Sequence, residues 1–538
     1  MLLGTHDIPG LRCLLTVALH RGISARGLVL RLQQAIDGVY RPWGGFNQRD
    51  QDISFLVKAI AGPQLLYALQ KSHGLASTST VQRNTTVPRL LPSIGVPSKE
   101  EIDSNISAFL NPSVKPPPKS PFPGNILMFD GIALESKCRY CSRHDSVVGL
   151  CREHSQNVDP RVRSFKAIDD IHAALFDFAD DDEKKVCFGS DTTVVALAPY
   201  ARDDHYNPVP LVVSASDKTE KGDQIAQWIQ VLIDQYNNHI FGKVLHGPIF
   251  SIGSDSDACF QKARHIICIK TPINPASELG QIVCSLLGLN TFTSPEGITG
   301  TCDPKHVFKC QLPFLTNSLF LIALSSGFAT FFRSSEGFLV NDKIVGPTDI
   351  ITQLSHLPSM TSSDATSLLY PSDRQNVPKA VSLIQHLLQI HDLPETNHPG
   401  ENRSRKQVNF MSKMLGFFLQ PFIIVGMTLS QQLQSLSTYA HLAAALYIKH
   451  GTECLTSALF ADSQAIVKNI FLTVARLQVI DRELHFYLLM EGTDRLENLF
   501  CECRTQDHSR NFDIEQLGQK LSVATLINST FKKNPDLN

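Results

Sequence analysis

The sequence lacks a large excess of charge of either sign. Its 49 lysine and arginine residues nearly balance 51 aspartate and glutamate residues, and the formal net charge is -2. Such a chain has no global basic field, so any surface that binds nucleic acid must be a local patch. A hydrophobic share of 43% and a charged share of 19% are ordinary for a folded globular protein.

Long hydrophobic runs are also missing. The most apolar windows, 319–332 and 415–429, are shorter than the roughly 20 residues that a membrane-spanning helix needs. We therefore expect no membrane partner. The first residues contain Asp7 and no early basic cluster, which argues against a secretory signal peptide.

The thirteen cysteines show no regular spacing, so the sequence does not indicate a disulfide framework. The pattern predicts reduced thiols and an intracellular location, nuclear or cytoplasmic. The chain has no glycine-rich phosphate loop of the Walker type, so nothing in the sequence supports nucleotide binding.

Helical periodicity dominates two regions of the chain, one before and one after its central part. Apolar spacing predicts helices within residues 1–110, with a break at Gly62-Pro63 and a Ser/Thr-rich loop at 77–86. Residues 111–124 contain six prolines and read as an extended linker between domains. Residues 303–480 are again mostly helical, with polar breaks near 357–373 and 395–405. In that region we expect Asp462 to open a helix and the basic patch 403–406 to lie on a solvated loop.

A short apolar run, Ile126 to Leu134, carries one carboxylate, Asp130, at its centre. A run this short and apolar predicts a strand buried on both faces. An unpaired buried carboxylate is costly, so Asp130 requires a cation, a neutral form or a turn position. The turn remains an open alternative, because Asp-Gly at 130–131 is a common hairpin signal.

The segment that follows predicts further strands and one crossover helix. Residues 138–151 suggest an antiparallel pair, and two β-rich runs lie at 194–197 and 209–214. Residues 222–236 form an amphipathic pattern with Asp223 as its cap. The next apolar strand ends at Asp255, which is the usual layout of a strand whose carboxyl end holds a site.

Three isolated carboxylates, Asp130, Asp255 and Glu497, could share one site. Carboxylates from two neighbouring strands and a covering helix can hold two Mg²⁺ ions about 4 Å apart for phosphodiester chemistry. Each has an alternative. Asp255 could be a turn residue, with Asp257 equally eligible, and Asp191 is a rival for the first carboxylate. Glu497 follows Asp494 by three residues, the spacing of a capping box.

Several segments resemble the transposase-derived proteins of mushroom-forming fungi, and more distantly the P-element and THAP-domain transposases. The segments are 127–131 (LMFDG), 149–154 (GLCREH), 246–255 (HGPIFSIGSD), 301–309 (TCDPKHVFK), 373–380 (DRQNVPKA) and 492–500 (GTDRLENLF). The resemblance implies an α/β fold with an RNase H-like mixed sheet, an N-terminal helical domain and a large helical insertion. It places Asp130, Asp255 and Glu497 on the family's metal-binding triad, and Asp303 with His306 on its Asp-x-x-His signature.

With that resemblance we divide the chain into five parts. They are a helical domain at 1–110, a linker at 111–124, the first part of the core at 125–302, a helical insertion at 303–483, and a core helix with tail at 484–538. The expected function is transposase-like DNA processing by an Asp/Asp/Glu triad with Mg²⁺ or Mn²⁺, with DNA and further copies of the chain as partners. The alternative is a catalytically inactive domesticated relic that binds DNA or protein.

Two weaker groups of residues remain. Asp303, His306 and Lys309 could stabilise the core, contact DNA phosphate or only cap a helix. Cys138, Cys141, Cys151 and His154 have the ligand types and pairing of a zinc site. The resembling family keeps the second pair without the first, which favours coincidence over zinc.

Overall fold

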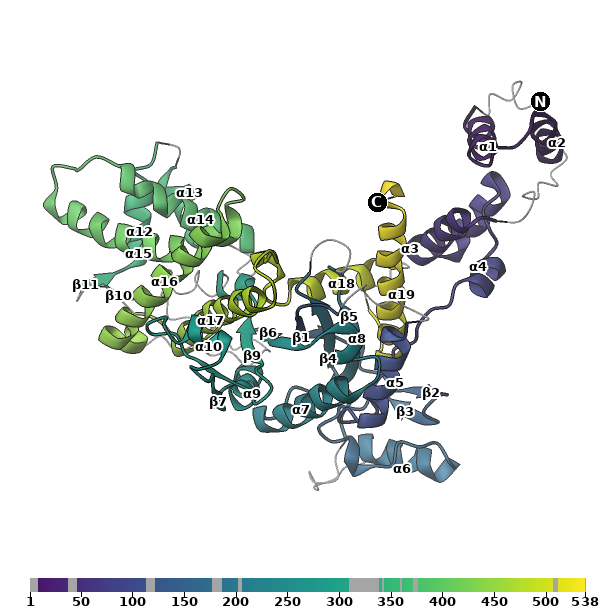
Figure 1. The fold of residues 1–538 in the computed structure, drawn as a ribbon, viewed down its shortest axis with the longest axis horizontal. Helices are drawn as coiled ribbons and strands as arrows, with labels where there is room; N and C mark the ends of the chain where they lie inside the picture. The colour runs from purple at the N-terminus through teal and green to yellow at the C-terminus, as the bar shows by residue number, and fades with distance from the viewer. Residues whose placement is uncertain are drawn as a thin grey trace.

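The computed structural model describes residues 8–36, 46–112, 121–176, 186–201, 206–308, 338–340, 343–358, 360–370, 376–506 and 511–537. Figure 1 shows the arrangement of their helices and strands. Lys309, the apolar window 319–332 and most of the proline-rich linker lie outside these residues.

A mixed five-stranded sheet lies at the centre of the fold, in the order β5-β4-β1-β6-β9. Its strands are β1 (Asn125–Ala133), β4 (Asp191–Pro199), β5 (Val209–Ser216), β6 (Ile249–Ser254) and β9 (Thr299–Cys302). β4 runs antiparallel to β1 and β5, whereas β1, β6 and β9 are parallel. The carboxyl ends of β1, β6 and β9 therefore lie at one edge of the sheet.

β1 is the strand that the apolar run predicted. Asp130 is paired with Val194 and Gly131 with Thr193 of β4, so the chain continues through both residues and the turn alternative is wrong. Phe129 is fully buried and packs against Trp228 with ring centroids 5.9 Å apart. Because side chains alternate along a strand, Asp130 faces the opposite side of the sheet from Phe129.

Helices cover both faces of the sheet. On the Phe129 side lie α7 (Gly222–Asn238) and α9 (Ala258–Cys268), and in Figure 1 these are below the strands. Above the strands are α17 (Ser457–Ile480), which contacts β9, and α18 (Asp494–Thr505), which contacts β1. Asp130 therefore faces the side on which α18 lies.

Some predicted boundaries in this region need correction. The predicted cap of α7 was Asp223, but the helix is capped at Lys221. The Asp223 carboxylate pairs with Lys262 at 2.9 Å. Thr456 caps α17, so Asp462 lies inside the helix and does not open it. The antiparallel pair predicted within 138–151 is present as β2 (Arg139–Cys141) and β3 (Ser146–Val148).

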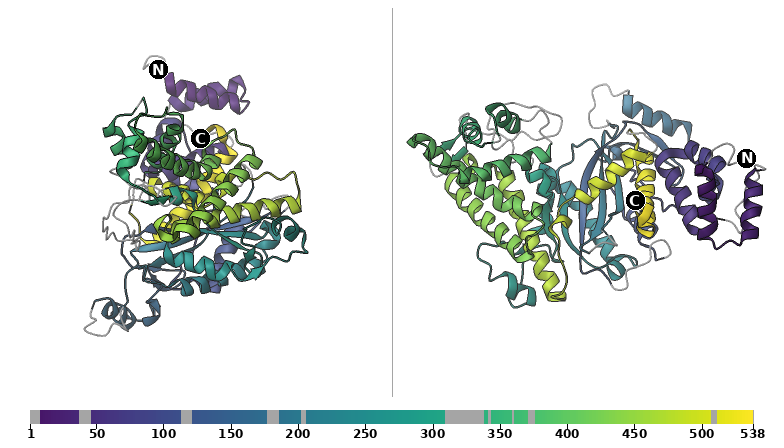
Figure 2. Two further views of the ribbon diagram at one scale, coloured as in Figure 1. Left: turned by 90° about the vertical axis from the view of Figure 1, so that its left-hand side faces the viewer. Right: turned by 90° about the horizontal axis from the view of Figure 1, so that it is seen from above.

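The helical lobe consists of α12 to α16 and stands at one end of the molecule (Figure 2). Its helices are α12 (Pro347–Leu354), α13 (Ser362–Leu369), α14 (Val377–Gln389), α15 (Pro399–Ile423) and α16 (Leu429–His450). The polar breaks predicted near 357–373 and 395–405 are wrong in part, because α13 lies within the first range and α15 begins within the second. Thr361 caps α13, and 403–406 lies within α15, where buried Arg405 donates to Gln353 Oε1 at 2.8 Å.

The N-terminal helices stand at the other end (Figure 2). They are α1 (Ile8–His20), α2 (Ala25–Ile36), α3 (Gln48–His73) and α4 (Thr78–Asn84), whereas α5 (Lys99–Leu110) packs on α7 and β5 at the centre of the fold. The predicted break in α3 is present as non-helical Gly62. The predicted loop at 77–86 is wrong, because the Ser77 side chain caps α4 by accepting from the Thr80 N–H.

A separate small core joins the N-terminal helices α3 and α4 to the C-terminal helix of the chain. Phe55 and Leu66 of α3 and Val81 of α4 pack with Ile527 of α19 (Ile514–Lys533). Two described helices, α3 and α17, have the length and composition that crossing a membrane requires. In this fold, α17 packs on β9 and α3 packs on α4 and α19.

Candidate metal-binding acidic site

Four carboxyl groups gather at the carboxyl edge of the parallel strands. Asp130 lies in β1, Asp255 directly follows β6, and Asp303 directly follows β9. Since these strands are parallel, residues at their carboxyl ends share one edge of the sheet. The fourth carboxyl group, Glu497, comes from α18, which contacts β1.

The electrostatics of Asp130 reflect this gathering. Burial raises the pKa of Asp130 well above its usual value, and the charge of Asp255 raises that pKa further. The charges of Glu497 and Asp303 act in the same direction, whereas a hydrogen bond from the Gly131 N–H (2.7 Å) opposes the shift. Burial also raises the pKa of Asp255. Carboxylates that disfavour one another's charge in this way are stabilised by a cation between them.

Asp303 is the most buried of the four, with 1% of its surface exposed. Burial, followed by the charge of Glu497, raises its pKa to about 7. Its Oδ1 accepts the Lys305 N–H at 3.1 Å. Its Oδ2, although buried, has no hydrogen-bond partner among the described residues, so one acceptor atom is left for another ligand.

His306 completes a compact group with Asp303 and Glu497. One ligand atom of each residue lies within 4.8 Å of the others, and His306 Nε2 is 3.9 Å from Glu497 Oε1. The three side chains thus offer two oxygens and one nitrogen to a single cation. The Asp-x-x-His spacing places both of its residues beside the glutamate helix.

The orientation of Glu497 bears on its capping alternative. α18 is capped at Thr493 without a side-chain hydrogen bond, and the Glu497 side chain lies toward His306. The apolar face of α18 is buried, and it consists of Leu496, Leu499, Phe500 and Cys503. That burial fixes the rotation of α18 and leaves Glu497 partly exposed at the site.

Two rival carboxylates have other partners. Asp257 caps α9 by accepting from the backbone N–H groups of Cys259 (2.8 Å) and Phe260 (3.3 Å). Its own N–H donates to Asp255 Oδ1 at 3.1 Å, so the cap helps to orient Asp255. Asp191 pairs with Lys218 at 3.1 Å, beside Gly131.

Sequence reasoning missed a buried polar network that supports the loop before α18. Glu491 accepts from Asn469 Nδ2 at 2.9 and 3.0 Å and from the Thr301 hydroxyl. Burial raises the pKa of Glu491 to about 7. Fully buried Arg495 donates to the carbonyl oxygens of Pro199 (2.9 Å) and Met490 (3.1 Å). No local pattern marks this network, because the partners of Glu491 and Arg495 at Thr301, Asn469 and Pro199 are remote in the sequence or lie on other elements.

Gly492 lets this loop approach Asp303 closely. Its φ is +81°, and a Cβ at this position would lie 2.9 Å from the Asp303 Cα. A positive φ and the absence of a side chain are both properties of glycine. The loop that leads into the glutamate helix therefore rests directly on the carboxyl end of β9.

The four predicted zinc ligands do not assemble as one group. The structure places Cys151 and His154 beside Cys187 and Asp217, and this group contains neither Cys138 nor Cys141.

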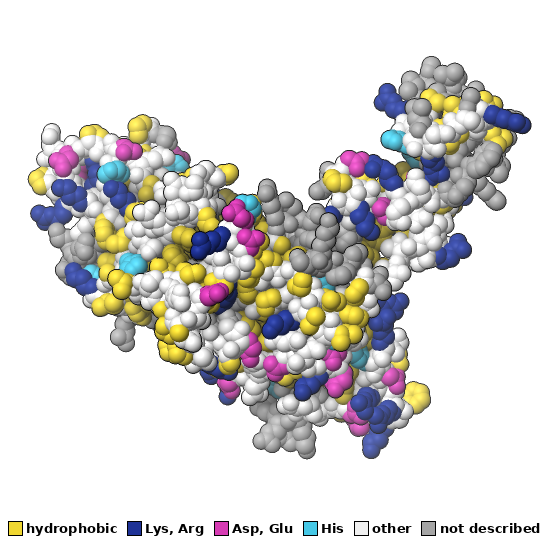
Figure 3. Space-filling model, in the orientation of Figure 1, with side chains coloured by type: hydrophobic (Ala, Val, Ile, Leu, Met, Phe, Trp, Pro, Cys, Tyr) yellow, Lys and Arg dark blue, Asp and Glu magenta, His cyan; other side chains and the backbone are white. Residues whose placement is uncertain are grey.

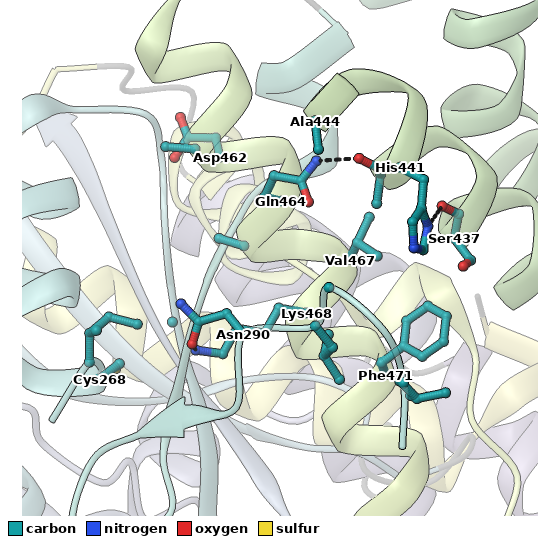
Figure 4. Close-up of a pocket in the computed structure, with 18 of the residues that line it drawn as sticks. Cys268, Asn290, Ser437, His441, Ala444, Asp462, Gln464, Val467, Lys468 and Phe471 are labelled. Atoms are coloured by element: carbon teal, nitrogen blue, oxygen red, sulfur yellow. Dashed lines mark hydrogen bonds between the residues drawn. The ribbon is translucent and has the colours of Figure 1, made fainter. Parts of the chain in front are cut away.

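A cavity of about 590 Å³ lies between α9, α16 and α17. Figure 4 shows Asp462, Gln464 and Lys468 among its lining residues. Their polar groups have protein partners: Asp462 pairs with Arg264 at 3.0 Å, Gln464 donates to Ala440 O at 3.1 Å, and Lys468 donates to Asn290 at 3.2 Å. None of the four carboxyl groups lines this cavity.

Lysine and arginine side chains are scattered over the face drawn in Figure 3 and form no single basic field there. This distribution agrees with the nearly balanced charge of the chain.

Comparison with known proteins gives a likeness of fold. No protein-family model matches the sequence, and no curated protein matches it. The chain is similar to a solved structure described as "Drosophila P element transposase strand transfer complex", with a TM-score of 0.52 and 14% sequence identity. The match covers 97% of this chain and 99% of that one. The chain thus shares the mixed α/β fold of a P-element transposase over nearly its whole length.

Proposed function

We propose that this chain is a transposase-like protein that processes DNA by two-metal phosphodiester hydrolysis and strand transfer. The observation that carries the proposal is that Asp130, Asp255, Asp303 and Glu497, which are remote in the sequence, come to one edge of the sheet, where the charges of the other three raise the pKa of Asp130. Asp303 and Glu497 also form a compact group with His306. The solved structure of similar fold is that of a strand transfer complex of the Drosophila P element transposase.

The topology of the sheet supports this assignment. An antiparallel β5-β4-β1 meander continued by parallel β6 and β9 is the strand arrangement expected of an RNase H-like core. In such a core, one acidic residue comes from the first strand, a second from the end of the neighbouring strand, and a third from a covering helix. Asp130 in β1, Asp255 after β6 and Glu497 in α18 would take these three positions.

The ligand chemistry fits hard divalent cations. Mg²⁺ and Mn²⁺ prefer carboxylate oxygens, and the partly exposed Asp130, Asp255 and Glu497 side chains provide them. Asp130 would bridge two cations, Asp255 would hold one and Glu497 the other. When bound, such a pair activates a water or hydroxyl nucleophile and stabilises the leaving oxygen.

The chain's other residues would orient this triad. Asp257 holds Asp255 through its backbone N–H, and His306 lies beside Glu497. The buried Glu491 and Arg495 network fixes the loop from which α18 starts. DNA as partner, assembly with further copies of the chain and a nuclear or cytoplasmic location belong to the same proposal.

The test is DNA nicking by the purified full-length protein. We expect nicking and joining of DNA with Mg²⁺ or Mn²⁺, none with a chelator, and none for Glu497→Gln. Glu502→Gln is the matched control, because Glu502 lies on the same helix but pairs with Asn528 of α19 at 2.9 Å. Glu502→Gln should keep activity.

Two outcomes would contradict the proposal. Wild-type protein that binds DNA but never nicks it would favour the inactive relic. Nicking that persists in Glu497→Gln would come from another site or from a contaminant.

A further inference from the structure

A second group of ligand-type side chains lies at another place in the fold. Cys151, His154, Cys187 and Asp217 each offer one ligand atom, and these four atoms lie within 4.8 Å of one another. The residues come from three separate segments. Cys151 and His154 lie in the turn after β3, Cys187 precedes β4, and Asp217 directly follows β5.

Backbone hydrogen bonds hold the three segments together without help from these side chains. The Cys151 N–H donates to Cys187 O at 2.9 Å, and the Gly189 N–H donates to Gly149 O at 2.9 Å. The Arg152 N–H donates to Ala215 O at 3.0 Å, next to the end of β5. The cluster is therefore built on a fixed backbone frame.

The two residues between Cys151 and His154 bind the segment that contains the end of β5 and the residues after it. Arg152 pairs with Glu220 at 2.8 Å, and Glu153 accepts from the Ser216 hydroxyl at 2.5 Å. Cys151 and His154 are left to face the cluster. Spacing of Cys and His by three residues lets both side chains reach one point from a single turn.

The contacts converge on one atom of the imidazole ring. His154 Nδ1 lies 3.4 Å from Cys151 Sγ and 3.2 Å from Asp217 Oδ2. A Cys-His-Asp catalytic relay uses both ring nitrogens, one for the thiol and one for the carboxylate. Nδ1 carries at most one proton, so it cannot donate to both neighbours, and the Cys151 thiol is itself within hydrogen-bond reach of Asp217. The three groups therefore crowd around one point. A cation among the ligands would satisfy them together.

Asp217 is oriented in the manner of a metal ligand. Its Oδ1 accepts from the Thr219 hydroxyl at 2.6 Å and from the Thr219 N–H at 3.0 Å. Its Oδ2 is left to face His154. Hydrogen bonds to the oxygen that does not face the metal commonly fix the orientation of a ligating carboxylate.

We infer that Cys151, His154, Cys187 and Asp217 form a zinc site that ties the turn after β3 to the start of β4 and the end of β5. Two sulfurs, one imidazole nitrogen and one carboxylate oxygen make a tetrahedral set that suits Zn²⁺. Binding would release the two thiol protons to solvent and leave the complex with one net negative charge. The inference does not depend on the proposed nuclease activity.

The test is metal analysis of the full-length protein expressed with added zinc. Elemental mass spectrometry should find about one zinc ion per chain in the wild type. Cys187→Ser should lower the zinc content about tenfold or more. Cys138→Ser is the matched control and should keep its zinc, because Cys138 is outside the group.

Cobalt(II) gives a second readout that does not need activity. Wild-type protein loaded with cobalt should show the visible bands of tetrahedral coordination and thiolate-to-metal charge transfer. If Cys187→Ser fails to fold, Cys187→His should still bind cobalt with about half of that charge transfer, since one of two thiolates is gone.

Three results would overturn the inference. They are wild-type protein without zinc or cobalt binding, zinc loss in Cys138→Ser equal to that in Cys187→Ser, and an unchanged cobalt spectrum in Cys187→His.

Discussion

Replacing Asp303 by asparagine should make the protein more stable at neutral and alkaline pH. Burial and the charge of Glu497 raise the pKa of Asp303 from 3.8 to about 7. A carboxyl group whose pKa is raised by folding stabilises the fold fully below its unfolded pKa and loses that contribution as the pH rises through its folded pKa. The affected window therefore runs from about pH 4 to pH 7.

The size of the effect follows from the shift. A change of about three pKa units corresponds to about 4 kcal/mol at 1.36 kcal/mol per unit, as an upper bound. An asparagine side chain carries no charge at any pH, so Asp303→Asn should gain stability relative to wild type as the pH rises. We expect a relative gain of about 1 to 3 kcal/mol between pH 5 and pH 8.

Urea denaturation at several pH values, with a chelator present to remove divalent cations, measures this difference. Asp364→Asn is a suitable control, since Asp364 is fully exposed at a helix cap and its pKa is lowered by Thr361. Its difference from wild type should stay flat between pH 5 and pH 8. A flat difference for Asp303→Asn as well would refute the electrostatic reasoning for the acidic site.

Two further substitutions test the loop that carries the glutamate helix. Gly492→Ala should cost about 2 kcal/mol or more in unfolding free energy, because the new Cβ would meet the Asp303 backbone. The control is Gly297→Ala, which has a similar φ of +83° but open space around it and should cost about 1 kcal/mol. Equal costs for the two would mean that the close approach is unimportant. Arg495→Met leaves the buried carbonyl oxygens of Pro199 and Met490 without their donor and should cost about 3 kcal/mol in unfolding free energy, measured by urea denaturation. The control is Arg482→Met at an exposed position, which should change stability by less than about 0.5 kcal/mol. A cost for Arg495→Met as small as the control's would contradict the role given to the network.

Local patterns were sufficient to predict β1, β6 and α18 beside the acidic site, but they did not predict β9, which leads to Asp303. The run at 126–134 is short and apolar enough to specify β1, and four apolar residues at helical spacing specify the buried face of α18. The gathering of Asp130, Asp255 and Glu497 was expected from the family resemblance, since no local pattern records contacts between segments hundreds of residues apart.

Local patterns failed where a polar side chain had a structural use. Ser and Thr at 77–80 read as loop, but one of them caps α4. The basic stretch 403–406 reads as a solvated surface, but Arg405 is buried by partners on α12. Cys187 and Asp217 have no motif that joins them to Cys151, because β4 and β5 bring them together only after folding.

The small core shared by α3, α4 and α19 has a consequence for synthesis. The first helices leave the ribosome long before their packing partner at 514–533 exists. At 5 to 20 residues per second, the wait is on the order of tens of seconds. During that time Phe55 and Leu66 lack the part of their native cover that α19 supplies, so the newly made N-terminal segment is a natural client for chaperones.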